Sequence, residues 1–317
     1  MVILVTGGAG FIGSHLCERL LGEGHRVVCL DNFDDFYDPH IKRRNIREAT
    51  KKAGFELVEG DIRNSGLIAR VFQGQTFDVV VHLAARAGVR PSIDSPKLYE
   101  EINVQGTVSL LDACREFDTR SIVFASSSSV YGGNSKVPFS EEDRVETPIS
   151  PYGATKKAGE LFCYTYHRLF GINIACLRYF TVYGPRQRPE MAIHKFTRLI
   201  DGNEKVPLYG DGQSMRDYTY IDDIIDGTVG AIHANEGYEI YNLGESRTIR
   251  LSDLIRMLEK TLGKGAIIEG LPEQRGDMPV TYANIEKAKK KLGYAPRVSM
   301  EEGIRRFVEW YRQNRFA

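Results

Sequence analysis

The chain has 317 residues, of which 42 are acidic and 42 basic, so its formal net charge is zero. This balance gives no reason to expect nucleic acid or an anionic membrane surface as the main partner. The length is sufficient for a large hydrophobic core in one or two lobes, and no apolar run approaches the roughly 20 residues that a membrane span requires.

Over the first 180 residues, short apolar runs alternate with helical patterns. The runs are rich in β-branched residues, as expected of strands covered on both faces, and lie at 2–5, 26–30, 55–58, 79–82, 121–125 and 173–178. The helical patterns lie between them, at 11–23, 40–52, 65–72, 98–116 and 152–170. This alternation predicts an α/β fold with a Rossmann-type doubly wound parallel sheet.

After about residue 180 the alternation ends, and glycine and proline become frequent. Short helical patterns follow at 192–201, 222–234, 251–262 and 300–314. We therefore predict two lobes of one compact unit. Residues 1–180 form the dinucleotide-binding lobe, residues 181–317 form mainly a smaller α/β substrate lobe, and the chain crosses between them.

A glycine-rich turn stands between the first apolar run and the first helical pattern. Gly7, Gly10 and Gly13 let the backbone approach a pyrophosphate, which the N–H groups of a helix N-terminus can bind. Asp31 ends the second run, where a carboxylate can accept hydrogen bonds from an adenosine ribose and would repel a 2′-phosphate. Asp61 follows the third run, where an adenine contact can form. The pattern predicts NAD rather than NADP.

Tyr152 and Lys156 are four residues apart in a helical pattern that begins at Pro151, so they share one face. A nearby ammonium and a positive nicotinamide favour the phenolate of a tyrosine and lower its pKa, which makes the pair a candidate acid and base. The hydroxyls of residues 126–129 follow the fifth run and are expected to face the ligand crevice. One of them can relay a proton between a sugar and Tyr152.

Together these motifs resemble the extended short-chain dehydrogenase/reductase family, and the resemblance covers essentially the whole chain. The residues that carry it are 6–13, 82–85, 126–132, 152–156 and 216–218. Within that family the chain is similar to NAD-dependent nucleotide-sugar 4-epimerases. A finer resemblance to UDP-glucuronate 4-epimerases rests on residues 31–39, 87–90, 180–185 and 188–192.

The resemblance implies a set of site residues and a homodimer formed by the helices near 98–116 and 152–170. Ser127 would relay the proton, Tyr152 would act as the base and Lys156 would hold the nicotinamide ribose. The implied NAD site consists of Gly7, Gly10, Phe11, Ile12, Gly13, Asp31, Asn32, Asp61, Ile62, Leu83, Ala84, Ala85, Asn103, Tyr152, Lys156 and Tyr179. The implied UDP-sugar site consists of Arg90, Ser128, Ser129, Thr181, Arg188, Ala192, Arg216, Arg275 and Asp277.

The implied reaction inverts C4 of UDP-glucuronate to give UDP-galacturonate through a 4-keto sugar. That keto sugar is a β-keto acid and can lose CO₂, so we expect Ser128, Ser129, Thr181 and Arg188 to fix its carboxylate. The related 4,6-dehydratases carry Asp-Glu where Ser128 and Ser129 stand, so dehydration is not expected. Arg186-Gln187-Arg188 departs from the Trp-Gly-Arg of many glucuronate epimerases. The departure leaves a neutral UDP-glucose or UDP-N-acetylglucosamine epimerase open, and UDP-glucuronate decarboxylation is a further alternative.

Other function classes have no motif support. The seven histidines show no HExxH spacing, and no GxSxG or GxxxxGK[ST] run occurs, so neither a metal site nor serine hydrolysis nor P-loop chemistry is predicted. A silent NAD-binding regulator would be expected to lack Tyr152 or Lys156. The five cysteines are odd in number and show no CxxC spacing, and there is no leader pattern at the N-terminus. These features predict a cytoplasmic enzyme with reduced thiols.

Overall fold

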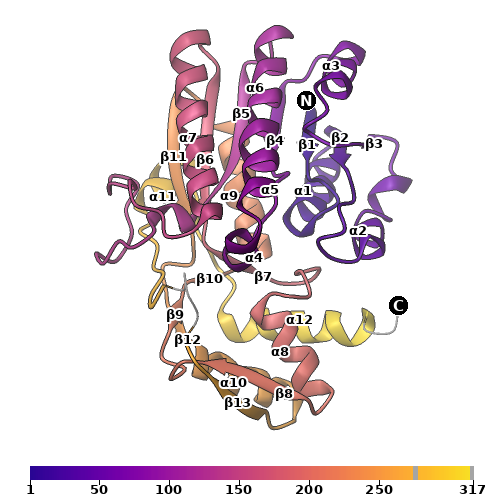
Figure 1. The fold of residues 1–317 in the computed structure, drawn as a ribbon. Helices are drawn as coiled ribbons and strands as arrows, with labels where there is room; N and C mark the ends of the chain where they lie inside the picture. The colour runs from indigo at the N-terminus through magenta and orange to yellow at the C-terminus, as the bar shows by residue number, and fades with distance from the viewer. Residues whose placement is uncertain (274–277, 315–317) are drawn as a thin grey trace.

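The computed structural model describes residues 1–273 and 278–314. Within these residues the larger lobe contains a seven-stranded parallel sheet in the order β11-β6-β5-β4-β1-β2-β3 (Figure 1). The strand order reverses between β1 and β4, which is the point where ligands bind in doubly wound sheets. The predicted Rossmann-type fold is therefore confirmed. The strands are β1 (Val2–Thr6), β2 (Arg26–Asp31), β3 (Phe55–Glu59), β4 (Val79–His82), β5 (Ser121–Ser127), β6 (Asn173–Tyr179) and β11 (Tyr238–Leu243).

Helices cover both faces of the sheet, because successive side chains of each buried strand point to opposite faces. In β1, Ile3 and Val5 belong to one apolar core, whereas Leu4 belongs to the other. The first face is covered by α1 (Phe11–Gly22), α9 (Ile221–His233) and α11 (Glu286–Leu292). The second is covered by α3 (Ser65–Gly74), α6 (Gly106–Glu116) and α7 (Pro151–Phe170).

Two helical patterns differ in detail from the prediction. The helix expected over 40–52 is α2 (Pro39–Asn45), followed by the separate 3₁₀ turn η1 (Ala49–Lys51). The helix expected over 98–116 begins earlier, with α5 (Pro96–Glu100), and passes through the π-helical turn η2 (Glu101–Gln105) into α6. Such π turns are frequent at functional sites, and this one contains Asn103.

The large sheet extends beyond the boundary expected at residue 180. Strand β11 follows α9 in the second half of the chain and pairs with β6 along its whole length. The crossing between lobes therefore returns a strand to the larger sheet, because β6 would otherwise present an unpaired edge.

The smaller lobe lies beyond the carboxyl-terminal edge of the sheet, on the side away from the N-terminus (Figure 1). Its elements are short, and β7 pairs with β10, β9 with β12 and β8 with β13. They are β7 (Thr181–Tyr183), α8 (Ala192–Asp201), β8 (Lys205–Tyr209), β9 (Met215–Arg216), β10 (Tyr218–Tyr220), β12 (Ile249–Arg250), α10 (Leu251–Leu262), β13 (Ile267–Leu271) and α12 (Met300–Asn314). Two short helical segments complete the larger lobe near the interface, α4 (Val89–Asp94) and the 3₁₀ turn η3 (Ser128–Tyr131). Among the described residues, no helix has the length and apolar character needed to cross a membrane.

Candidate active site

A cavity of about 360 Å³ lies between the two lobes, at the carboxyl ends of β1, β2, β4, β5 and β6. It contains most of the residues predicted from the sequence, drawn from both the NAD set and the sugar set. They are Gly7, Gly10, Phe11, Ile12, Gly13, Asp31, Asn32, Asp61, Ile62, Leu83, Ala84, Ala85, Ser127, Ser128, Ser129, Tyr152, Lys156, Tyr179, Thr181 and Arg188.

Four predicted residues lie outside the lining of this cavity. Asn103 lies one layer behind it and hydrogen bonds the backbone of Arg86, a lining residue. Arg90 stacks on the Tyr209 ring of the smaller lobe at 4.9 Å. Ala192 begins α8 next to the lining residue Met191, and Arg216 donates to the carbonyl of Met215 in β9. Two further predicted residues, Arg275 and Asp277, lie outside the described residues.

The glycine turn fits a dinucleotide phosphate. Gly7 has a φ of +69°, and a Cβ added there would lie 2.7 Å from the backbone nitrogen of Ala84. Only glycine therefore allows β1 and β4 to approach this closely. The N-terminus of α1 follows directly, and its first residues line the cavity, so their N–H groups and the helix dipole favour an anion there.

Asp31 is held in place at the end of β2 by two backbone hydrogen bonds. Its two carboxylate oxygens accept hydrogen bonds from the backbone nitrogens of Ala9, at 3.1 Å, and Phe33, at 2.9 Å. Burial raises its pKa, although the charge of Lys42 and these two hydrogen bonds oppose the rise. Each carboxylate oxygen can accept a further hydrogen bond, so the residue can still receive a ribose hydroxyl.

Helix α7 presents Tyr152 and Lys156 to the cavity on one face. The hydroxyl of Ser150 caps the helix by accepting from the nitrogen of Gly153 at 3.1 Å, and Pro151 occupies the first turn. A Cβ at Gly153 would lie 2.5 Å from the carbonyl oxygen of Ser129. The glycine thus allows the start of α7 to pack directly against the serine run.

The electrostatics of Tyr152 differ from the sequence-based expectation. Burial raises the pKa of Tyr152, while a hydrogen bond with Ser127 and the charge of Arg188 lower it in part. The ammonium of Lys156 instead donates to the carbonyl oxygen of Ala125 at 2.7 Å. Ser127 and Arg188, rather than Lys156, are therefore the protein groups that favour the phenolate here.

A buried ion pair behind the site was missed at the sequence level. Glu160 lies one further turn along α7 and binds Arg178 of β6 through two hydrogen bonds, of 2.8 and 2.9 Å. The same carboxylate accepts a 2.6 Å hydrogen bond from the hydroxyl of Ser126. The pair therefore fixes the strand residue that immediately precedes Ser127. A charged residue within an otherwise apolar strand was the available signal.

The departure at residues 186–188 leaves the lining of the cavity almost unaffected. Arg186 turns to Glu18 of α1, with an ion pair of 2.8 Å, and Gln187 is buried and donates to the carbonyl of Val182. Of the three residues only Arg188 lines the cavity, where it forms an ion pair with Glu190 at 2.9 Å. The side chain proposed to bind a carboxylate therefore retains its place.

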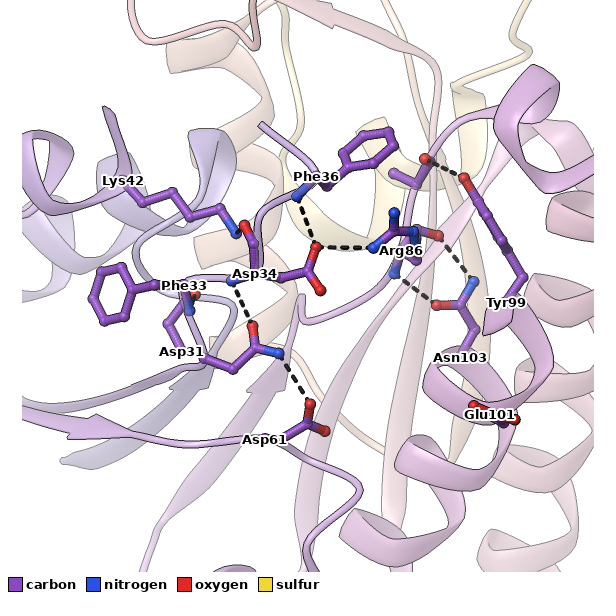
Figure 2. A network of polar contacts seen from close by, with 12 residues as sticks. Asp31, Phe33, Asp34, Phe36, Lys42, Asp61, Arg86, Tyr99, Glu101 and Asn103 are labelled. Carbon is purple, nitrogen blue, oxygen red and sulfur yellow. Dashed lines mark hydrogen bonds and ion pairs between the residues drawn. The ribbon is translucent and has the colours of Figure 1, made fainter. Parts of the chain in front are cut away.

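A second group of lining residues was also missed: Asp34, Phe36, Tyr37, Lys42 and Arg86. Figure 2 shows Asp34, Phe36 and Arg86 close together, with Asn103 beside Arg86 and hydrogen bonded to it. Four of the five belong to the segment or helix that follows β2. Part of this segment supported the family resemblance, but its side chains had no assigned role.

The comparisons with known proteins agree with this geometry. The sequence matches the family described as GDP-mannose 4,6 dehydratase over residues 4–307. A UDP-glucuronate 4-epimerase of Thermodesulfobacterium geofontis (strain OPF15) is 45% identical over 312 residues, covering 98% of this chain and 96% of the relative.

Two solved structures show the same similarity. UDP-glucuronic acid 4-epimerase from Bacillus cereus, in complex with UDP-glucuronic acid and NAD, gives a TM-score of 0.94 at 41% identity and covers 99% of both chains. UDP-glucose 4-epimerase from Thermotoga maritima, with UDP-glucose, gives a TM-score of 0.91 at 33% identity and also covers 99% of both chains.

Proposed function

We infer that this chain, which belongs to the GDP-mannose 4,6 dehydratase family of extended short-chain dehydrogenase/reductases, is an NAD-dependent 4-epimerase of UDP-glucuronate. The observation that carries the inference is the position of Arg188 in the same cavity as Ser127, Tyr152 and Lys156. A cation beside the acid-base pair suits a substrate with a carboxylate at C6 more than a neutral hexose.

The residues of the cavity can perform the proton transfers of the reaction. Tyr152 removes the proton of the C4 hydroxyl, and Ser127, which hydrogen bonds the phenol, can pass that proton between the sugar and the tyrosine. When bound, NAD would supply the acceptor and donor of the C4 hydride and a positive charge that favours the phenolate. Lys156 lines the same cavity, and we propose that it would hold the nicotinamide ribose.

Retention of the carboxylate distinguishes this reaction from decarboxylation. Decarboxylation of the 4-keto sugar requires its carboxylate to rotate until the breaking bond aligns with the carbonyl π system. Ser128, Ser129, Thr181 and Arg188 line one part of the cavity and supply three hydroxyls and a guanidinium. We propose that these groups hold the carboxylate out of that alignment. Dehydration lacks its acid-base pair, because serines stand at 128 and 129.

We propose that the UDP group binds at the smaller lobe. Arg90 and Arg216, with Ala192 at the start of α8, lie in or beside the smaller lobe, where an anchored nucleotide would let the keto sugar turn over. Arg275 and Asp277 complete this set outside the described residues.

The decisive experiment is incubation of the protein with UDP-glucuronate and NAD, read by proton NMR, with Tyr152→Phe as the matched control. The expected product is UDP-galacturonate, formed without CO₂ and absent from the Tyr152→Phe reaction. UDP-xylose or a 4-keto pentose would instead assign a decarboxylase. No reaction with UDP-glucuronate but turnover of UDP-glucose or UDP-N-acetylglucosamine would reject the proposed role of Arg188.

We also propose that the enzyme is a cytoplasmic homodimer. Helix α7 exposes the apolar side chains Leu161, Phe162, Tyr164 and Leu169, the last of them 67% exposed. Such a surface suits a second copy of the same helix. All five cysteines, which lie within the described residues, are buried free thiols, which suits a reducing compartment. Sedimentation velocity of the wild type and of Leu161→Asp tests the dimer. The wild type should sediment as a dimer and the variant as a monomer, because the substitution places a charge within the apolar face of α7.

A further inference from the structure

Two loops meet across the glycine turn. Strands β2 and β4 lie on either side of β1 in the sheet, so a contact between the segments that follow them must pass over the end of β1. Arg86, after β4, donates to the carboxylate of Asp34, after β2, at 2.9 Å. Both residues line the cavity that contains Gly7 and Gly10. The ion pair therefore joins the two loops that flank the glycine turn, in the wall of the same cavity.

The Asp34 side of this bridge is fixed by its own segment. The nitrogen of Asp34 donates to the side chain of Asn32 at 3.0 Å, and the nitrogen of Phe36 donates to the Asp34 carboxylate at 2.9 Å. The ammonium of Lys42 donates to the carbonyl of Asp34 at 2.9 Å. Asn32 in turn donates to Asp61, after β3, at 3.0 Å, so the loop that follows β2 is also bound to the segment that follows β3.

The Arg86 side is fixed equally well. The side chain of Asn103 accepts from the nitrogen of Arg86 at 2.8 Å and donates to its carbonyl at 3.0 Å (Figure 2). The guanidinium also stacks on the ring of Phe36, 4.9 Å from its centroid. The side chains of Arg86 and Asp34 are 19% and 28% exposed, so their attraction is screened less than that of a surface pair.

We propose that Arg86 and Asp34 form a clasp that closes over bound NAD and slows its release, with Arg86 facing the pyrophosphate. An enzyme that uses NAD catalytically and regenerates it in each turnover gains from retaining it. A cation above the pyrophosphate complements its charge from the side opposite the helix N-terminus. The clasp rests on the NAD binding assigned under Proposed function, but it requires no particular sugar.

The test is the rate at which NADH leaves the loaded protein. The protein is loaded with NADH and mixed with excess NAD, and the loss of bound-NADH fluorescence is followed for the wild type, Asp34→Asn and Arg86→Gln. Each single variant is expected to release NADH roughly tenfold faster, equivalent to about 1.4 kcal/mol. The double variant should release NADH less than a hundredfold faster than the wild type, roughly the product of the two single effects, because both substitutions remove the same contact.

Lys287→Gln is the matched control, because Lys287 also combines a part-buried ion pair, with Glu239 at 2.7 Å, with stacking on an aromatic ring, that of Tyr241. It lies in α11, away from the cavity, and its release rate should equal that of the wild type. Unchanged release in both Asp34→Asn and Arg86→Gln would overturn the clasp. So would a raised KM for UDP-glucuronate in Arg86→Gln with normal NADH release, since Arg86 would then contact the substrate. If the protein binds NADH but epimerises no sugar, the proposed function fails while the clasp can still be measured.

Discussion

The ammonium of Lys156 donates a 2.7 Å hydrogen bond to the carbonyl oxygen of Ala125, which joins α7, the helix of Tyr152, to β5, the strand that leads into the serine run. Lys156 is almost completely buried, and burial lowers its pKa to about 8. The protein therefore keeps a desolvated cation at this position even though an apolar side chain would suit the site better. A functional site often carries this kind of destabilising group.

Lys156→Met is expected to lower kcat by about 10²-fold, because the nicotinamide ribose would lose the ammonium proposed to position it, while the protein without NAD becomes more stable by about 1–3 kcal/mol. The stabilisation follows from the depressed pKa, because the unfolded state binds the lysine proton more tightly than the folded state does. The wild type regains this stability as the pH rises from about 8 toward 10.5. Urea unfolding at pH 7.5 and 9.5 should show the advantage of the variant shrinking. A variant that is less stable than the wild type at pH 7.5 would contradict this reading.

Arg188→Gln should separate acidic from neutral sugars. Loss of a charge-assisted hydrogen bond worth about 1.5–3 kcal/mol predicts a roughly 10- to 150-fold fall in kcat/KM for UDP-glucuronate. Any side turnover of UDP-glucose should be unaffected, because that substrate has no carboxylate. Glu190→Gln is the companion variant: it removes the ion pair of 2.9 Å that competes with the substrate for Arg188. Glu190→Gln should therefore lower KM for UDP-glucuronate. If Arg188→Gln lowered kcat/KM equally for UDP-glucuronate and UDP-glucose, Arg188 would not bind the carboxylate.

Glu160→Gln should destabilise the fold by about 3–5 kcal/mol, because it leaves the guanidinium of Arg178 buried without a counter-charge. Both side chains are within 1% of complete burial. The double variant Glu160→Gln/Arg178→Met should recover much of this loss, since it leaves no unpaired charge. Urea unfolding of Glu160→Gln, Arg178→Met and the double variant, each compared with the wild type, gives the coupling energy directly. Additive effects would show that the two residues do not depend on one another.

The sequence predicts those parts of the site that depend on local spacing. Gly7, Gly10 and Gly13 follow a strand, and the four-residue spacing of Tyr152 and Lys156 requires only helical geometry. Glu160 has the same spacing from Lys156 and could have been found in this way. The sequence also marks Arg178 as a charged residue in an apolar strand, but it does not pair Arg178 with Glu160, because only the fold brings β6 against α7.

The contact between Asp34 and Arg86 is a still longer-range consequence of the fold. These residues are 52 positions apart, and each belongs to a loop whose course depends on the segment that follows its strand. No periodicity relates them. The contact between Asn103 and Arg86 could not be predicted from the sequence either. It depends on a π-helical turn, and the sequence pattern there is that of a regular helix.

A chain of buried hydrogen bonds joins β1 to that π turn through His82. The hydroxyl of Thr107 donates to the carbonyl of Asn103 at 2.6 Å, so it accepts from Nε2 of His82, at 3.0 Å. Nδ1 of His82 then accepts from the hydroxyl of Thr6 at 2.7 Å. This arrangement requires the neutral imidazole with its proton on Nε2. Burial, with a smaller contribution from Lys156, lowers the pKa of His82 to about 3.

His82→Asn should therefore make the free energy of unfolding depend less on pH below about 6.5. The unfolded histidine binds a proton below pH 6.5 and the folded one only near pH 3, so wild-type stability is complete above 6.5 and falls through this window. The loss from His82 alone is about 2 kcal/mol at pH 5, at about 1.4 kcal/mol per pH unit. The variant loses hydrogen-bond geometry and starts less stable at pH 7.5, but the gap to the wild type should narrow as the pH falls to 5. Urea unfolding at both pH values measures that gap. A constant gap would mean that His82 does not titrate differently in the folded and unfolded states, and the neutral hydrogen-bonded chain through it would have to be abandoned.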